Sequence, residues 1–251
     1  ADDSLALLDE VGLLNERLIA AHFRVADEDD ITRMATNDAS VAHCPSIFCY
    51  WEPDGETDWT PVPSLREAGT TVGIGLDDHY WHDSSDLLGE ARQARLVANL
   101  SFGTNQFHSM ELVRMLTIEG ARALGVGDEL GSIEPGKRAD LIVLDLSDPK
   151  FAPKTNIPAL VANTATAGDI ESTIVDGELL MHDNEVRSMN PDEVCKRAEA
   201  AAKRFGDELG WKMDIGESDP PSQIRTVRDL PKRGPAHLLA RLGLQHIKDR
   251  L

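Results

Sequence analysis

Short, largely apolar runs recur through the first third of the chain. They occupy residues 18–23, 40–43 and 70–76, and each is too short for a typical helix. Continuous apolar runs of this length are expected of strands that are buried on both faces of a parallel sheet. We therefore expect a strand at each of the three positions.

Stretches with helical spacing of apolar residues separate these runs. Such spacing predicts helices at 5–11, 27–34, around Leu65, 83–100 and 110–124, with Asp83 or Ser84 capping the fourth. The segment from Pro45 to Pro61 is expected to be a long loop. Alternating strands and helices predict the α/β fold class with parallel strands.

After Gly125 the pattern becomes rich in turns and strands. The segment 131–137 is turn-like, and strands are expected at 139–145, 160–163, 171–175 and 178–182. Asp176-Gly177 is a pair typical of a tight hairpin between the last two. A small β-rich module therefore follows the α/β part, with a helix expected at 191–205, an irregular tail, and a further helix at 236–251.

Composition narrows the class of protein. Hydrophobic residues make up 41% of the 251 residues, and no apolar run approaches the ~20 residues of a membrane helix. With 44 acidic and 25 basic residues the net charge is −19, which repels nucleic-acid phosphates and anionic membranes. We expect no nucleic-acid partner and no membrane partner. Three cysteines are too few for a disulfide framework. The first residues are acidic, whereas a secretory signal peptide begins with basic residues. A cytoplasmic location is therefore expected.

Three polar residues fall at or near the carboxyl ends of the expected strands: His22, His43 and Asp77. In α/β barrels the active site lies at that end. Two imidazoles and a carboxylate that converge there would form a metal-binding or proton-transfer set. The alternative is that each histidine is a hydrogen-bonded core residue.

The stretch 77–83 concentrates three acids and two histidines in one turn. A self-contained metal site is one interpretation, but a tight turn cannot direct all of these side chains at one ion. The other interpretation is that Asp77 faces the centre while His79 or His82 lines the rim of a pocket.

Several motifs together resemble the amidohydrolase superfamily, and the resemblance covers about residues 5–205. The similar branch contains triazine chlorohydrolases, guanine deaminase and the deaminases of adenosylhomocysteine or methylthioadenosine. The motifs are the segments 21–31, 41–45, 73–77, 117–125, 131–143 and 174–177.

The resemblance implies a (β/α)8 TIM-like barrel, of which this chain would hold the C-terminal part with about strands 6–8. A small β-sandwich portion and C-terminal helices would follow. The implied domains are a partial metal-dependent hydrolase barrel at 1–127, the β-sandwich portion at 128–187, and a C-terminal helix with an irregular tail at 188–251.

The resemblance also implies roles for individual residues. Asp77 would be a catalytic residue and metal ligand, and His22 a catalytic residue that hydrogen-bonds the substrate or hydroxide. The expected cofactor is a divalent metal, zinc in the first place and iron as the alternative. Asp86 would be more structural than chemical, and the substrate pocket would be formed by His43, Asp78, His79 and Trp81.

Some positions depart from the pattern of that branch. Cys44 stands where Asn is usual, Ile47-Phe48 replaces a Ser-Asn pair, and Trp81 replaces Ser. The expected pocket wall is bulkier and more apolar, which favours an aromatic or heterocyclic ligand that stacks.

The superfamily's His-x-His pair of the first barrel strand is absent from this sequence. Three strands cannot close a barrel, and the chain starts with Ala1. We expect the C-terminal portion of a longer enzyme, with little or no activity of the fragment alone.

Three functions follow in order of preference. The first is metal-dependent hydrolysis of a non-peptide C–N bond, as hydrolytic deamination of a small purine-, pyrimidine- or triazine-like heterocycle. The second is an amidohydrolase of a cyclic amide or imidazolone, and the third a non-catalytic fragment that binds a partner. A homodimer is a possible assembly.

Overall fold

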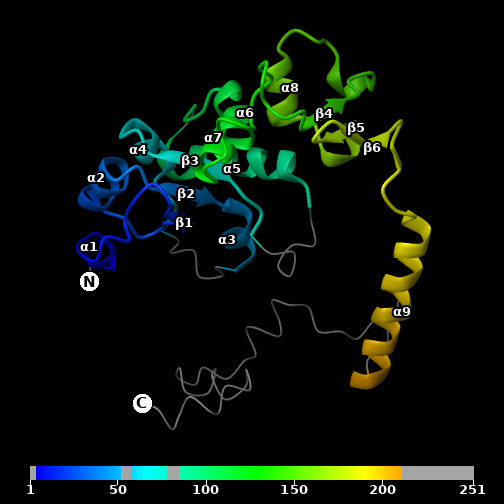
Figure 1. Ribbon diagram of the computed structural model, residues 1–251, viewed down its shortest axis with the longest axis horizontal. Helices are drawn as coiled ribbons and strands as arrows, with labels where there is room; N and C mark the ends of the chain where they lie inside the picture. The colour runs from blue at the N-terminus through cyan, green and yellow to red at the C-terminus, as the bar shows by residue number, and fades with distance from the viewer. Residues whose placement is uncertain (1–3, 52–57, 78–84, 104, 211–251) are drawn as a thin grey trace. The chain divides into compact units, whose positions relative to one another are not determined.

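The computed structural model of the chain describes residues 4–51, 58–77, 85–103 and 105–210 (Figure 1). It divides into two compact units, Ala1–Cys195 and Lys196–Leu251, which are considered separately. In the described part of the chain, no helix is both long and apolar enough to cross a membrane.

The first unit contains a three-stranded parallel sheet with the order β1-β2-β3. The strands are β1 (Ile19–Ala21), β2 (Ser40–His43) and β3 (Thr71–Ile74). All three coincide with strands expected from the sequence. In the register, Ala21 pairs with Ala42 and His43 pairs with Ile74, so the carboxyl ends of the strands lie at one edge.

Helices connect and cover these strands. They include α1 (Ser4–Glu10), α2 (Glu28–Thr36), α4 (Val62–Glu67) and α5 (Leu87–Phe102). A reciprocal capping box between Asp27 and Asp30 starts α2. Helix α5 begins later than expected, because Asp86 is its N-cap and accepts a hydrogen bond from the Gly89 backbone. Asp83 and Ser84, the caps expected from the sequence, lie outside the described residues.

Two expectations for this part of the chain were wrong. The segment after Pro45 is not wholly a loop, because it begins with helix α3 (Pro45–Trp51). The single helix expected at 110–124 is two helices, α6 (Ser109–Leu116) and α7 (Ile118–Ala123). Thr117 separates them with the non-helical backbone angles φ −124° and ψ −100°.

A four-stranded antiparallel sheet follows, with the order β4-β5-β6-β7. Its strands are β4 (Leu141–Leu144), β5 (Ile170–Val175), β6 (Glu178–His182) and β7 (Glu185–Val186). Short 3-10 turns η1 (Pro149–Phe151) and η2 (Ala167–Asp169) flank α8 (Ile157–Asn163), and α9 (Pro191–Leu209) comes last. The strand expected at 160–163 was wrong: the segment is α8, with Asn156 as N-cap and Pro158 in its first turn.

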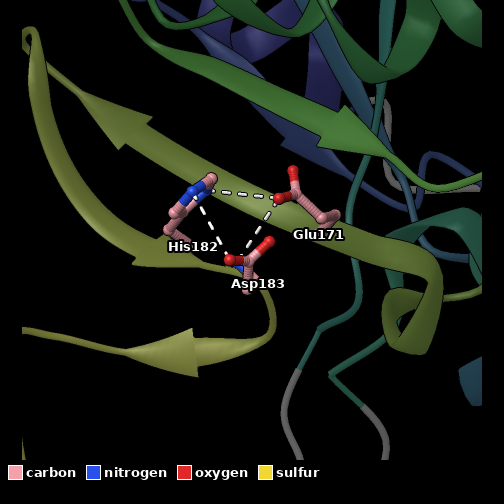
Figure 2. Close-up of side chains that lie close together, drawn as sticks. All are labelled: Glu171, His182 and Asp183. Atoms are coloured by element: carbon pink, nitrogen blue, oxygen red, sulfur yellow. Dashed lines mark hydrogen bonds and ion pairs between the residues drawn. The ribbon is translucent and has the colours of Figure 1, made fainter.

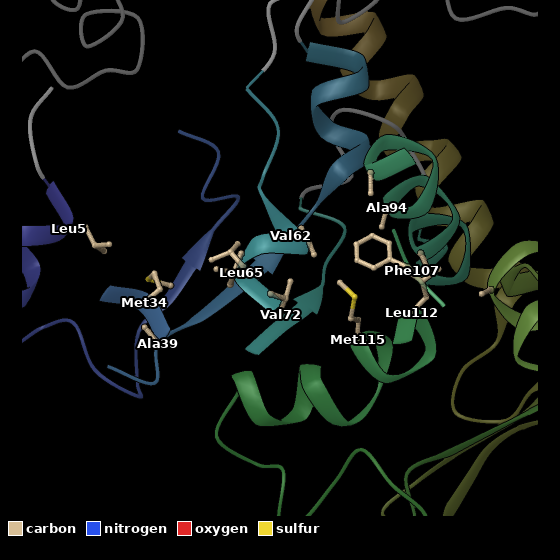
Figure 3. Close-up of a cluster of buried hydrophobic side chains, with 14 of the residues drawn as sticks. Leu5, Met34, Ala39, Val62, Leu65, Val72, Ala94, Phe107, Leu112 and Met115 are labelled. Carbon is tan, nitrogen blue, oxygen red and sulfur yellow. The ribbon is translucent and has the colours of Figure 1, made fainter. Parts of the chain in front are cut away.

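The main hydrophobic core connects the parallel sheet to the helices around it (Figure 3). Val41 and Val72 of the sheet are fully buried, as are Leu65 of α4 and Leu112 and Met115 of α6. A smaller cluster around Phe151 packs between α5 and the segments near β4 and α8. The site described below therefore rests on strands that are fixed by buried contacts.

In the turn-rich segment 131–137, Gly131 is the glycine with no space for a side chain. Its φ is +88°, and an added Cβ would lie 2.7 Å from the Cα of Ile118 and 2.8 Å from the Cβ of Ala121. We expect Gly131→Ala to lower the free energy of unfolding by roughly 2–4 kcal/mol, combining left-handed strain with overpacking. Urea unfolding monitored by circular dichroism measures this change.

Gly136 provides the matched control. Its φ is +97°, but nothing lies within 4 Å of the Cβ position. Gly136→Ala should therefore show only the backbone strain, about 1–2 kcal/mol. Equal losses in the two variants would show that the close approach of Gly131 to α7 contributes nothing.

Candidate active site

The site is formed where the parallel strands end. His22 directly follows β1, and its backbone N–H continues the ladder by donating to the carbonyl of Ala42 at 2.9 Å. Asp77 lies three residues after β3. The His22 Nε2 is 2.9 Å from the Asp77 Oδ2, and both side chains are about 30% exposed. The structure thus brings together the two residues expected to be catalytic, in a position that a small molecule can reach.

The backbone at both residues is left-handed. His22 has φ 66° and Asp77 has φ 65°, and Phe23 shares this conformation with φ 45°. Such angles are uncommon for residues other than glycine, and they concentrate at functional sites. They turn the chain sharply after each strand. The hydroxyl of Thr60 also donates to the His22 carbonyl and so holds the first turn.

His43 is the last residue of β2 and is only 3% exposed. Burial lowers the pKa of His43 to about 3, with a smaller contribution from His22, so its ring is neutral. Among the described residues, the buried Nδ1 atoms of His43 and of His22 have no hydrogen-bond partner. His43 therefore lies beneath the site as an uncharged group and is not an exposed ligand.

Cys44 follows His43 and is also buried. Burial and the nearby charges of Asp77 and Glu90 raise the pKa of its thiol to about 12. The thiol is therefore protonated, and it is not a nucleophile at neutral pH. Its Sγ lies 3.1 Å from the Cβ position of Gly75, so Cys44 fills the floor beside the strand that leads to Asp77.

Helix α3 provides an aromatic wall next to His22. The ring of Phe48 meets the imidazole of His22 edge to face, with the centroids 4.9 Å apart. The Arg24 guanidinium lies 4.0 Å from the centre of the same ring, and its Nε donates to the Asp58 carbonyl at 2.9 Å. One of the aromatic residues expected in the wall thus contacts the site directly.

The remaining predicted pocket residues, Asp78, His79 and Trp81, lie outside the described residues. Asp86 does have the structural role expected of it, as the N-cap of α5. Sequence reasoning missed Glu90, a carboxylate that is 3% exposed on α5. The signal available was an acidic residue within the apolar face of an amphipathic helix.

Comparison with known proteins identifies the family of this chain. Residues 2–180 match the amidohydrolase family. The chain belongs to the amidohydrolase family. A 5-methylthioadenosine/S-adenosylhomocysteine deaminase from Desulfitobacterium hafniense is 34% identical over 196 residues, which are 78% of this chain and 44% of that protein. The corresponding deaminase from Symbiobacterium thermophilum is 36% identical over 199 residues, 78% of this chain and 45% of that protein.

Two solved structures are similar to this chain in fold. An adenosine deaminase from Xanthomonas campestris with bound zinc superposes with a TM-score of 0.75 at 30% identity, over 80% of this chain and 45% of that one. The zinc complex of atrazine chlorohydrolase from Arthrobacter aurescens gives a TM-score of 0.68 at 24% identity, over 78% and 43%. This likeness supports an α/β fold of the TIM-barrel type. The chain spans less than half the length of these relatives.

A second group of potential metal ligands lies on the antiparallel sheet of this amidohydrolase (Figure 2). The Nδ1 of His182 is 3.2 Å from Glu171, and the Nε2 of His182 is 3.6 Å from Asp183. The Ser172 hydroxyl donates to Glu171 at 2.7 Å and lies 2.9 Å from the His182 Nδ1. These side chains already form hydrogen bonds and ion pairs with one another at the end of a hairpin. The cluster is therefore explained as a structural hydrogen-bond network.

A cavity of about 1100 Å³ lies beside β1. Its lining includes Leu18, Ala20, Phe23 and Arg24, but neither His22 nor Asp77. In the described part of the chain, β1 pairs only with β2, so its other edge has no strand partner. The cavity therefore flanks the open edge of the parallel sheet and is separate from the His22–Asp77 contact.

Proposed function

We propose that this chain supplies the His22–Asp77 part of the active site of a metal-dependent amidohydrolase. Its reaction is the hydrolytic deamination of a heterocycle that resembles a nucleoside or nucleobase. The observation that carries the proposal is the 2.9 Å contact between the His22 Nε2 and the Asp77 Oδ2 at the carboxyl ends of the strands. The deaminases among the relatives support the choice of reaction.

The residues of this site fit a divalent metal. Asp77 offers a partly exposed anionic oxygen, a donor that zinc accepts. Zinc is the metal in two of the related structures. When bound, the ion supplies Lewis acidity toward water and the substrate. Among the described residues Asp77 and His22 have no third donor close enough to complete a ligand set with them, so other segments would provide the remaining ligands.

The side chains of this chain would transfer the proton, hydrogen-bond the reacting oxygen and contact the substrate. The Asp77 carboxylate accepts a proton from the attacking water and delivers it to the departing amine. His22 hydrogen-bonds the oxygen that develops charge at the reacting carbon. Neutral His43 adds no positive charge beneath the site. Phe48 offers an aromatic edge beside His22, which favours a flat heterocyclic substrate.

We infer further that the parallel sheet corresponds to about strands 6–8 of a (β/α)8 barrel. The open edge of β1, the cavity beside it and the partial coverage of the relatives support this. Residues 1–127 would then be the partial barrel, 128–187 the β-sandwich portion with the antiparallel sheet, and 188–251 the C-terminal helix and tail. The rest of the barrel would come from additional polypeptide.

Ammonia release from a panel of heterocycles tests this function. The panel contains methylthioadenosine, adenosylhomocysteine, adenosine, guanine, an amino-triazine and a cyclic imide. We expect residues 1–251 alone to show little or no turnover, because ligands beyond Asp77 are needed. The same chain produced together with the coding region upstream of Ala1 is expected to bind stoichiometric zinc and to release ammonia from one of the amines.

The alternatives give different results in the same assay. Ring opening of the imide without ammonia release from any amine would indicate a cyclic-amide hydrolase. Absence of stoichiometric zinc and of turnover from the longer protein would indicate a binding module. Robust turnover by residues 1–251 alone would contradict the proposed division of the site.

A further inference from the structure

Glu90 is a buried carboxylate for which the proposed chemistry has no use. It lies on α5 and is 3% exposed. A carboxylate in such surroundings loses several kcal/mol of solvation unless other groups compensate it. One compensating group is the backbone N–H of Ser46, which donates to the Glu90 Oε1 at 2.8 Å. The partner therefore lies on α3, the helix that follows His43.

The contact occurs at the first turn of a short helix. Ser46 is the second residue of α3, where backbone N–H groups have no acceptor within the helix. Pro45 before it has no N–H at all. Glu90 thus caps α3 from a distant element, and its negative charge lies at the favourable end of the helix dipole. The Glu90 charge is also felt by the cysteines that precede and follow this turn. It helps to raise the pKa of the Cys44 thiol, after burial and Asp77, and that of the Cys49 thiol, after burial.

Helix α3 is also the element that presents Phe48 to the site. The Phe48 ring meets the imidazole of His22 edge to face at 4.9 Å, and His22 in turn contacts Asp77. Helix α3 packs against α5, so the position of Phe48 depends on how α3 is held there. A continuous set of contacts leads from Glu90 through Ser46 and Phe48 to His22.

We propose that Glu90 is a positioning residue, which fixes α3 through the Ser46 N–H so that Phe48 holds His22 in its orientation toward Asp77. The proposal deepens the proposed function, because it takes His22 as a group of that site. Glu90 would act on His22 through the backbone of α3 and not as a catalytic residue.

Nuclear magnetic resonance of the histidine-labelled full chain tests this without any need for turnover. We expect Phe48→Leu to shift the ring-proton signals of His22, because the ring current of Phe48 is lost. Glu90→Leu should shift the same signals, and the double variant should shift them no further than Phe48→Leu alone. Glu90→Gln, which keeps an acceptor oxygen, should restore the signals toward those of the unaltered chain.

Glu119 offers the matched control. It is also a buried acid, 8% exposed, but it pairs with Arg66 and Arg114 on other helices. Glu119→Leu should lower stability while it leaves the His22 signals in place. An unchanged His22 signal in a folded Glu90→Leu chain, an additive double variant, or an equal shift from Glu119→Leu would overturn the proposal.

Hydrogen exchange in the unaltered chain gives a test that needs no folded variant. The Ser46 amide should exchange slowly, although it has no acceptor within its helix. Exchange at the rate of an unstructured peptide would overturn the role of Glu90 even if Glu90→Leu fails to fold. Because neither readout uses activity, failure of the deaminase assay and failure of this proposal remain distinguishable.

Discussion

Asp77→Asn is expected to lower kcat by about 10²–10⁴-fold in the longer, active protein that the proposed function requires. The amide removes the negative charge that would hold a divalent ion, and it cannot accept the proton of the attacking water. Asparagine tolerates the left-handed backbone of position 77, where φ is 65°. The loss should therefore come from chemistry and not from misfolding. Ammonia release and zinc content measure it together.

Asp176→Asn is the matched control for this prediction. Asp176 is an exposed aspartate with φ 49° in the hairpin turn between β5 and β6, far along the sequence from the site. The same chemical change there should leave turnover and zinc content at the level of the unaltered protein. Normal turnover in Asp77→Asn would remove Asp77 from the proposed mechanism.

The strands of the site were predictable because a strand that is buried on both faces consists of a short, continuous run of apolar residues. Segment 40–43 was assigned with the bounds that β2 has in the structure. The convergence of His22 and Asp77 also followed from strand direction alone, since parallel strands end at one edge. Their left-handed backbone angles did not follow, because nothing in either residue type requires them.

Helix α3 was missed for a physical reason that is visible in its contacts. Pro45 is typical of loops as well as of first helical turns, and the group that caps the helix, Glu90, is 44 residues away from Ser46. A cap supplied by another element has no local signature. Helix α8 shows the opposite difficulty, because its short apolar run fits a strand as well as a helix. Only Asn156 and Pro158 at its start distinguish the two.

His43 should make the protein's stability depend on pH in the weakly acidic range. Its pKa is about 3 in the folded protein, mainly because burial disfavours the charged ring, against about 6.5 when exposed. Between these values the unfolded chain binds a proton that the folded chain does not. The free energy of unfolding is therefore expected to fall as pH decreases through 6.5, with a slope that approaches about 1.4 kcal/mol per pH unit near pH 5. Well above pH 6.5 this contribution is complete and constant.

Urea unfolding at pH 7, 6 and 5 measures the slope before most carboxylates titrate. His43→Gln is the control, since a neutral amide at this position binds no proton in either state while every other titratable group is retained. The difference between the two slopes isolates His43. Because the Nδ1 of His43 has no partner among the described residues, no hydrogen bond of that atom is lost in the variant. Equal slopes would show that the imidazole becomes charged within the folded protein, which would place water or a compensating group beneath the active site.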